Sequence, residues 1–292
     1  MFYLVGSIIL TSYLVLSFKL AERLRLNAFQ VIVFNYITCV ITGSLFNGYF
    51  PINNTAIQAN WFPWAAVMGV FFISLFTVVA ATTRHANVAV ASVAYKLSLV
   101  IPFIFSIYLY DEKATLLKIV GIAVALLAVV LTCWPSQGTA QTGNKKNYLL
   151  FILPFVLFIG SGILDTMIKY VEQEFLNDSN KNDYLITAFT SAALIGTILL
   201  LIQIYNGKQT FTWKAVLLGI SIGIPNYFSI WCLVQVLKAY PKDSSMIIPI
   251  NNMGIVLFST LVAWITFKEK LSLINWIGVI LSLGAIALIA YG

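Results

Sequence analysis

Charged residues are scarce in this chain of 292 residues, which has 17 Lys and Arg, 10 Asp and Glu, and 9% charged residues overall. Soluble domains carry about 25% charged residues, because a compact core needs a polar shell. Hydrophobic residues make up 60% of the sequence. The scarcity of charge therefore excludes an ordinary soluble domain and indicates a chain whose surface faces lipid.

Histidine and cysteine are also scarce. His85 is the only histidine, and Cys39, Cys133 and Cys232 show neither a CxxC spacing nor a cluster with histidine. The sequence lacks HExxH and GxSxG motifs, and the net charge of +7 comes from scattered Lys and Arg, with no basic cluster longer than a pair. We therefore expect no enzymatic activity, no metal or cofactor, and no nucleic-acid partner.

Long apolar runs are abundant. A helix needs roughly 20 consecutive apolar residues to cross a bilayer, whereas a barrel strand needs about 10 residues of alternating polarity. The runs in this chain match the helical pattern, so we predict an all-α integral membrane protein with ten transmembrane helices. These are Phe2–Leu20, Ala28–Tyr49, Trp61–Thr83, Val88–Tyr110, Ala114–Trp134, Tyr148–Tyr170, Tyr184–Tyr205, Trp213–Lys238, Ser244–Phe267 and Leu271–Tyr291.

A polar linker, residues 135–147, divides the chain into residues 1–134 and 148–292, each with five expected helices. The two halves resemble each other, which indicates an internal repeat. Lys19 and Lys169 end the first helix of each half. At a constant offset of 157 residues, the matching pairs are Glu112 with Glu269, Lys113 with Lys270, and Gly121 with Gly278.

The odd number of helices in each half has a topological consequence. After five crossings the second copy enters the membrane from the opposite side, so the two copies are related by a pseudo-twofold axis in the membrane plane. Inverted repeats of this kind are common in secondary transporters, whose substrate site lies near the midplane. The sequence therefore predicts two inverted five-helix repeats and favours transport.

The duplicated Glu-Lys pair, the glycine that follows it and the prolines before it (Pro102, Pro249) carry a family resemblance. The chain resembles the drug/metabolite transporter superfamily, in its EamA-like ten-helix branch, over nearly its whole length. The resemblance implies export or exchange of small metabolites such as amino acids, by alternating access, in a bacterial inner membrane. The family commonly has an arginine in the second helix, where this chain has Phe34-Asn35-Tyr36.

Lys96 is the first candidate for a substrate contact. It lies about nine residues into the fourth expected helix, and a charged side chain at membrane depth costs roughly 3 kcal/mol on insertion scales. We expect Lys96 to bind an anionic group of the substrate, and the alternative is a structural pair with Asp165. Asp165 is also the candidate for ion coupling, or for a pair with Lys169 one helical turn away.

Polar and aromatic side chains of the other helices are expected to complete a mostly apolar pocket. Their alternative role is hydrogen bonding and packing between helices. The substrate-binding candidates besides Lys96 are Tyr95, Asn251, Asn252, Asn226, Tyr227, Trp231, Tyr13 and Asn35.

Function, oligomeric state and the side of the termini each leave alternatives open at the level of sequence. The chain could be a channel for ions or small solutes, or an exporter of cationic drugs, and it could act as a monomer or a homodimer. The loops on the side of the first connection carry more Lys and Arg, which places both termini outside, whereas the family resemblance implies cytoplasmic termini.

Overall fold

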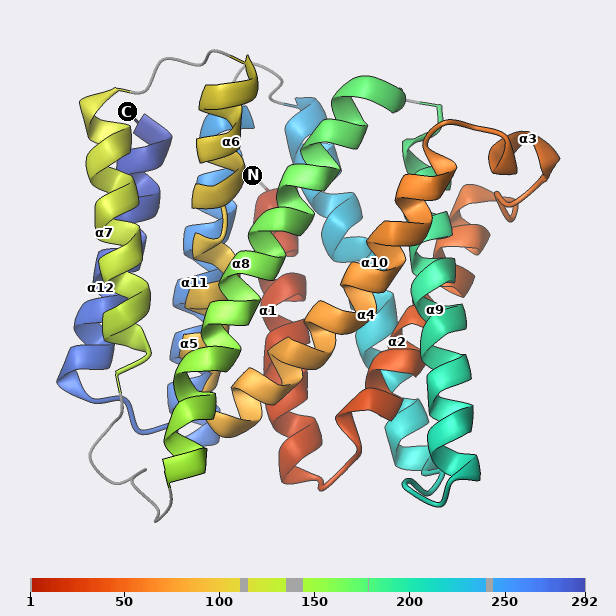
Figure 1. The fold of residues 1–292 in the computed structure, drawn as a ribbon, viewed down its shortest axis with the longest axis horizontal. Coiled ribbons are helices and arrows are strands. Elements are labelled where there is room, and N and C mark those ends of the chain that lie inside the picture. The colour runs from red at the N-terminus through yellow and green to blue at the C-terminus, as the bar shows by residue number, and fades with distance from the viewer. Residues whose placement is uncertain (1, 111–114, 135–143, 178, 240–243, 292) are drawn as a thin grey trace. The chain divides into compact units, whose positions relative to one another are not determined.

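The computed structural model describes residues 2–110, 115–134, 144–177, 179–239 and 244–291. Every regular element in these residues is a helix (Figure 1). The helices are α1 (Phe2–Arg23), α2 (Ala28–Asn47), α3 (Asn54–Ile57), α4 (Phe62–His85), α5 (Val88–Leu97), α6 (Val100–Tyr110), α7 (Leu116–Thr132), α8 (Asn144–Phe175), α9 (Lys181–Tyr205), α10 (Trp213–Ala239), α11 (Ser244–Phe267) and α12 (Leu273–Tyr291).

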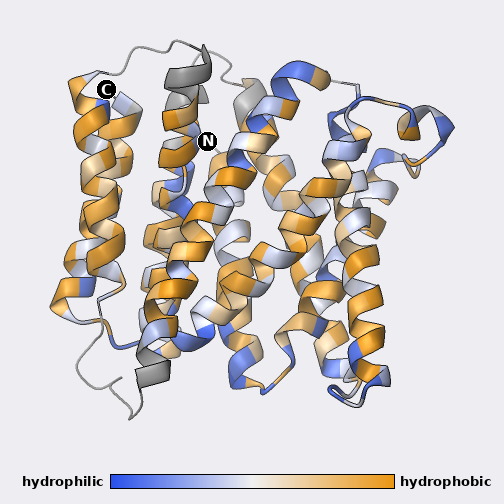
Figure 2. Ribbon diagram, viewed as in Figure 1, coloured by the Kyte–Doolittle hydropathy of each residue, from blue (hydrophilic) through white to orange (hydrophobic). Residues whose placement is uncertain are grey.

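Among the described residues, 8 helical segments are long and apolar enough to cross a membrane. Two further apolar helices are shorter, Leu116–Thr132 in α7 and Leu273–Ile289 in α12. Figure 2 shows apolar residues along the helices and polar residues gathered toward the connections. The all-helical class predicted from the sequence is therefore confirmed, and the helices are compatible with a multi-pass membrane protein.

The fourth expected helix is interrupted, and the prediction of one continuous helix from Val88 to Tyr110 is wrong. α5 ends at Leu97 and α6 begins at Val100. Pro102 explains the break, because it has no N–H to donate to the carbonyl of Ser98 and its ring clashes with that carbonyl in a regular helix. The Ser98 carbonyl instead accepts from the nitrogen of Ile101 at 2.9 Å, which forms a tighter turn.

The helices group into two compact units, each of which we describe by itself. Unit 1 comprises Met1–Lys19, Val78–Ile163 and Phe228–Gly292. In it, α7 and α12 pack along their length, and α5 packs against α11. The core is formed by small and branched apolar side chains of these four helices, among them Ala89, Val93, Leu97, Ala125, Ala128, Val256, Val279, Ala285 and Ile286.

Antiparallel packing of α7 and α12 depends on two glycines. A Cβ on Gly121 would lie 2.8 Å from Ile289 Cγ1, and a Cβ on Gly278 would lie 2.5 Å from the backbone nitrogen of Thr132. Without a side chain at these positions the two helices approach closely, as helices do in membranes, where small residues mediate packing.

Unit 2 comprises Leu20–Thr77 and Leu164–Tyr227. Its central pair is α2 and α9, and three aromatic rings fill the space beside them. The ring centroid of Tyr36 lies 6.1 Å from that of Phe72 and 6.0 Å from that of Phe189. The Tyr36 hydroxyl donates to the carbonyl of Phe72 at 2.9 Å, which satisfies the one polar group of this aromatic cluster.

Several predicted boundaries shift by a few residues, as helix ends commonly do. α1 extends beyond Leu20 to Arg23, and α8 runs from Asn144, inside the expected linker, to Phe175, inside the expected polar loop. Residues 135–143 of the linker lie outside the described residues, as do Glu112 and Lys113 of the first half. The division into residues 1–134 and 148–292 stays a prediction.

Candidate functional site

The break between α5 and α6 places Lys96 at a helix end. Lys96 is central in the apolar segment Val88–Phe105, yet it lies in the last turn of α5. The carboxyl end of a helix carries a partial negative charge, which favours an ammonium group. The Nζ of Lys96 also lies 4.4 Å from the ring centroid of Tyr95, within the range of a cation–π interaction. The interruption therefore places the ammonium group of Lys96 where a helix end and an aromatic ring both favour its charge.

α11 supplies polar groups to the same unit. Its Ser259 hydroxyl donates to the Ser92 hydroxyl of α5 at 2.8 Å, and both side chains are fully buried. Asn251 and Asn252 precede this contact in α11 and are 3% and 9% exposed. The Oδ1 atom of Asn251 has no hydrogen-bond partner in the described part of the chain, and an unmade bond of this kind costs about 1–3 kcal/mol. A ligand donor at Asn251 would remove that cost.

Trp231 and Tyr13 belong to unit 1 as well. The Trp231 ring meets Tyr3 of α1 edge to face, with centroids 5.5 Å apart. α1 also reaches α11, because the Ser12 hydroxyl next to Tyr13 donates to the carbonyl of Ile255 at 3.4 Å. Tyr13 and Trp231 are half-buried, so their rings lie at the margin of the core.

Asn35, Asn226 and Tyr227 belong to unit 2. Asn226 Nδ2 donates to Asn35 Oδ1 at 3.1 Å, and the Cys39 thiol donates to the carbonyl of Gly223 at 3.4 Å. Asn35 is fully buried, and its Nδ2 has no acceptor among the described residues. Tyr227 is 2% exposed and packs on Phe46, with ring centroids 6.0 Å apart. These three residues form a buried polar cluster between α2 and α10.

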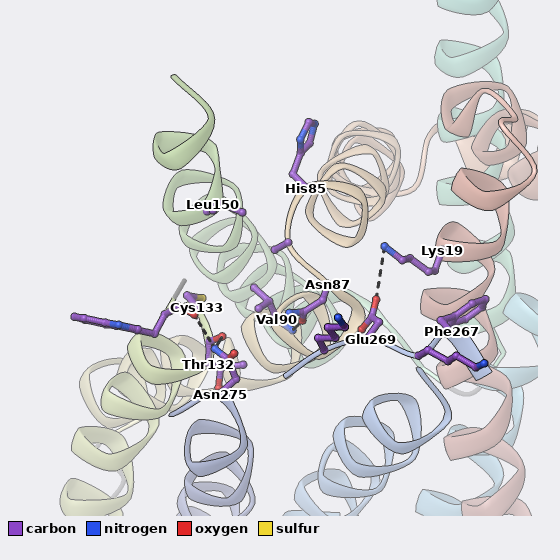
Figure 3. A pocket seen from close by; sticks show the side chains of 14 residues that line it. Lys19, His85, Asn87, Val90, Thr132, Cys133, Leu150, Phe267, Glu269 and Asn275 are labelled. Carbon is purple, nitrogen blue, oxygen red and sulfur yellow. Dashed lines mark hydrogen bonds and ion pairs between the residues drawn. The ribbon is translucent and has the colours of Figure 1, made fainter. Parts of the chain in front are cut away.

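A cavity of about 280 Å³ opens at the N-terminal end of α5, with all its lining residues in unit 1. Figure 3 shows Lys19 and Glu269 pointing toward each other across it. Lys19 Nζ lies 3.7 Å from Glu269 Oε1, and both carboxylate oxygens accept from the nitrogen of Val88, at 3.2 and 3.0 Å. The lining residues are Lys19, His85, Ala86, Asn87, Val90, Thr132, Cys133, Trp134, Leu150, Phe267, Lys268, Glu269, Lys270 and Asn275.

One wall of the cavity is formed by the junction of α7 and α12. Asn275 Nδ2 lies within hydrogen-bonding distance of the carbonyls of Leu131, Thr132 and Trp134, at 3.3, 2.9 and 2.8 Å. Figure 3 shows Asn275 next to Thr132.

The expected site residues thus belong to both units. Lys96 and Tyr95 share the end of α5, Asn251 and Asn252 lie on α11, which packs against α5, and Asn35 and Asn226 bond to each other in unit 2. Asp165 lies half-buried in α8, in unit 2, and its pairing with Lys96 or Lys169 stays a prediction.

Sequence reasoning identified Glu269 only as part of the repeat. It missed the pairing of Glu269 with Lys19 and Val88, which brings together segments about 250 and 181 residues apart. The only signal in the sequence for Glu269 was the repetition of the Glu-Lys pair. This repetition indicates the residue but not the residues that it contacts.

Comparisons with known proteins identify a shared fold. No family model matches the chain. The chain is similar to an uncharacterised protein of Haemophilus influenzae, at 25% identity over 279 residues, covering 94% of this chain and 92% of that protein. A protein of known crystal structure aligns with 99% of this chain and 96% of its own, with a TM-score of 0.58 and 16% identity. At this identity the likeness shows a shared fold alone.

Proposed function

We propose that the protein is a secondary transporter of small metabolites, such as amino acids, with ten transmembrane helices arranged as two inverted five-helix repeats. On the same grounds we propose that it belongs to the EamA-like branch of the drug/metabolite transporters, in a bacterial inner membrane. The eight long apolar segments and the two shorter helices α7 and α12 make up the ten crossings. Helices of 17 residues are at the lower limit for spanning.

The observation that carries this proposal is a set of swapped contacts. In unit 1, Gly121 of α7 meets Ile289 of α12, and Gly278 of α12 meets Thr132 of α7. Gly121 and Gly278 are related by the offset of 157 residues, and so are Thr132 and Ile289. The two glycines that the offset of 157 residues relates thus each let the partner helix approach closely, which supports an inverted repeat.

Unit 2 contains the same reciprocity. Gly43 of α2 meets Ile186 of α9, while Gly196 of α9 meets Val33 of α2. Both pairs of equivalents, 43 with 196 and 33 with 186, are 153 residues apart. The contacts run antiparallel, which an inverted repeat requires and a parallel repeat does not produce.

A second helix pair in unit 2 repeats the pattern. A Cβ on Gly69 of α4 would lie 2.8 Å from the carbonyl oxygen of Ala188, and a Cβ on Gly223 of α10 would lie 2.6 Å from that of Asn35. Residues 69 and 223 are 154 apart, and residues 35 and 188 are 153 apart. Small changes of offset fit insertions of a few residues in the loops.

The interrupted helix supports transport over a merely structural membrane role. Discontinuous helices in transporters expose backbone groups and helix ends at a substrate site near the midplane. Lys96 at the end of α5 would bind an anionic group, and Asn251 and Asn252 of α11 would supply further polar contacts. Since α5 comes from the first half and α11 from the second, motion of one half against the other would open the site alternately to each side.

The first test is substrate binding. Purified wild-type protein and Lys96→Ala are compared by thermal unfolding with a panel of amino acids, nucleosides and quaternary ammonium compounds, with Lys181→Ala as a surface control. We expect a carboxylate-bearing ligand to raise the unfolding temperature of the wild type and of Lys181→Ala, because binding stabilises the folded state by mass action. Lys96→Ala should not respond. An equal response of all three proteins would remove Lys96 from the site.

Transport itself is tested with the ligand so identified. In proteoliposomes preloaded with unlabelled ligand, an alternating-access transporter accumulates labelled ligand transiently by exchange. A channel, which is the competing function, only equilibrates the label. Absence of this exchange would reject the proposed function, whatever the binding result.

A further inference from the structure

Glu269 occupies a position in which proteins commonly bind anions. Its carboxylate accepts from the nitrogen of Val88, the first residue of α5, and lies beside the ammonium group of Lys19. A helix N-terminus and a lysine are the groups that hold carboxylates and phosphates in many sites. The Glu269 side chain is 6% exposed. The chain thus supplies its own carboxylate to a site that borders an open cavity.

Positive charge around this cavity exceeds what Glu269 neutralises. Lys268 and Lys270 also line it, together with His85. In the part of the chain that the structure describes, neither Lys268 nor Lys270 is paired with a carboxylate. Three ammonium groups therefore border a space that contains one carboxylate, which favours a second anion.

We propose that this cavity binds a small carboxylate or phosphate anion, which replaces the carboxylate of Glu269 at Lys19 and at the N-terminus of α5. The cavity volume of about 280 Å³ accommodates a small organic anion. Val88 and Lys96 lie at opposite ends of α5, eight residues or about 12 Å apart, so this anion site is distinct from the proposed contact at Lys96. The inference goes beyond the proposed function, because it requires binding only.

The test is rescue of a missing carboxylate by an added one. Full-length Glu269→Ala is purified in a neutral detergent, and its unfolding temperature is measured in sodium acetate, sodium phosphate or sodium chloride of equal ionic strength. We expect a loss of several degrees relative to wild type, of which acetate or phosphate restores at least half and chloride does not. Lys19→Ala combined with Glu269→Ala should lose the rescue. Glu172→Ala, which removes the exposed partner of Lys181, should not respond.

Two outcomes would overturn the proposal. One is a response of Glu269→Ala to acetate and phosphate no larger than its response to chloride. The other is rescue that occurs only in nanodiscs of phosphatidylglycerol and not in those of phosphatidylcholine, which would assign the site to a lipid headgroup.

A second variant keeps the proposal testable if Glu269→Ala does not fold. Glu269→Gln keeps the side chain's size and removes its charge. With Cys39→Ser and Cys232→Ala, Cys133 is the remaining thiol, and it lines the same cavity. We expect acetate to slow the reaction of Cys133 with maleimide at least twofold relative to chloride. An unchanged rate would overturn the proposal.

Discussion

At the scale of single residues, the junction of α7 and α12 shows how this chain replaces water at a buried helix end. The last carbonyls of a helix have no partner within the helix. Asn275, 1% exposed, donates to the carbonyls of Leu131, Thr132 and Trp134. Three residues further along α12, Gly278 lets the end of α7 approach. One turn of α12 thus both satisfies and packs against the end of α7.

The glycines of α12 provide a matched pair of substitutions. Gly278→Ala should lower the free energy of unfolding by roughly 1–3 kcal/mol, because its Cβ would overlap the backbone of Thr132. Gly284→Ala, on the same helix, meets nothing within 4 Å, so it should be neutral or stabilise the protein by about 0.5–1 kcal/mol. Reversible unfolding in denaturant measures both. Equal effects would mean that close packing at Gly278 does not matter.

The sequence indicated Gly278 through its match with Gly121, and the structure supplies the reason for both. It could not indicate Asn275, because the carbonyls that Asn275 satisfies are more than 140 residues away in the chain. The local sequence pattern indicates which segments are apolar enough to form helices in lipid. Contacts between residues far apart in the chain depend on tertiary packing, which no single segment encodes.

At the scale of secondary structure elements, prolines act differently according to their surroundings. Pro102 separates α5 from α6, whereas Pro154 lies inside the continuous helix α8. Hydropathy predicted the segment Val88–Tyr110 correctly as apolar, but it carries no information on whether the backbone is continuous. Pro102 was the available signal for the break, but Pro154 shows that a proline alone does not specify one.

Removing the proline tests the role of the break. Pro102→Ala restores an N–H that can donate to the Ser98 carbonyl, so α5 and α6 should join and the protein should become more stable, by up to about 3 kcal/mol. Lys96 would then lose its place at a helix end, and ligand exchange in proteoliposomes should fall at least tenfold. Pro154→Ala is the control and should leave exchange within twofold of wild type. Full exchange by a more stable Pro102→Ala would show that the interruption is not needed for transport.

At the scale of the whole molecule, the two shorter helices α7 and α12 decide the number of crossings, and α7 decides on which side the connection between α9 and α10 lies. If α7 spans the membrane, the connection between α9 and α10 lies on the side opposite to the N-terminus. If α7 does not span, that connection lies on the same side as the N-terminus. Counting of apolar residues alone does not separate these outcomes, because α7 is only 17 residues long.

A reporter in the connection between α9 and α10 distinguishes the two topologies. With Cys39, Cys133 and Cys232 replaced, Lys208→Cys supplies one exposed thiol. We expect a membrane-impermeant maleimide to label it in oriented vesicles only from the side opposite to an N-terminal tag. A second cysteine at Arg25, in the connection between α1 and α2, should label from the same side as residue 208. Labelling of residue 208 on the side of the tag would reject ten crossings.

The swapped glycine contacts have a consequence for the history of the chain. If the halves form the proposed inverted repeat, one half carries both sides of each of these glycine contacts. Two separate copies of such a half, inserted in opposite orientations, would present the same surfaces to each other. The proposed repeat is what fusion of two tandem gene copies would leave behind if the ancestor was an antiparallel homodimer, and the polar segment between the halves would then mark the point of fusion.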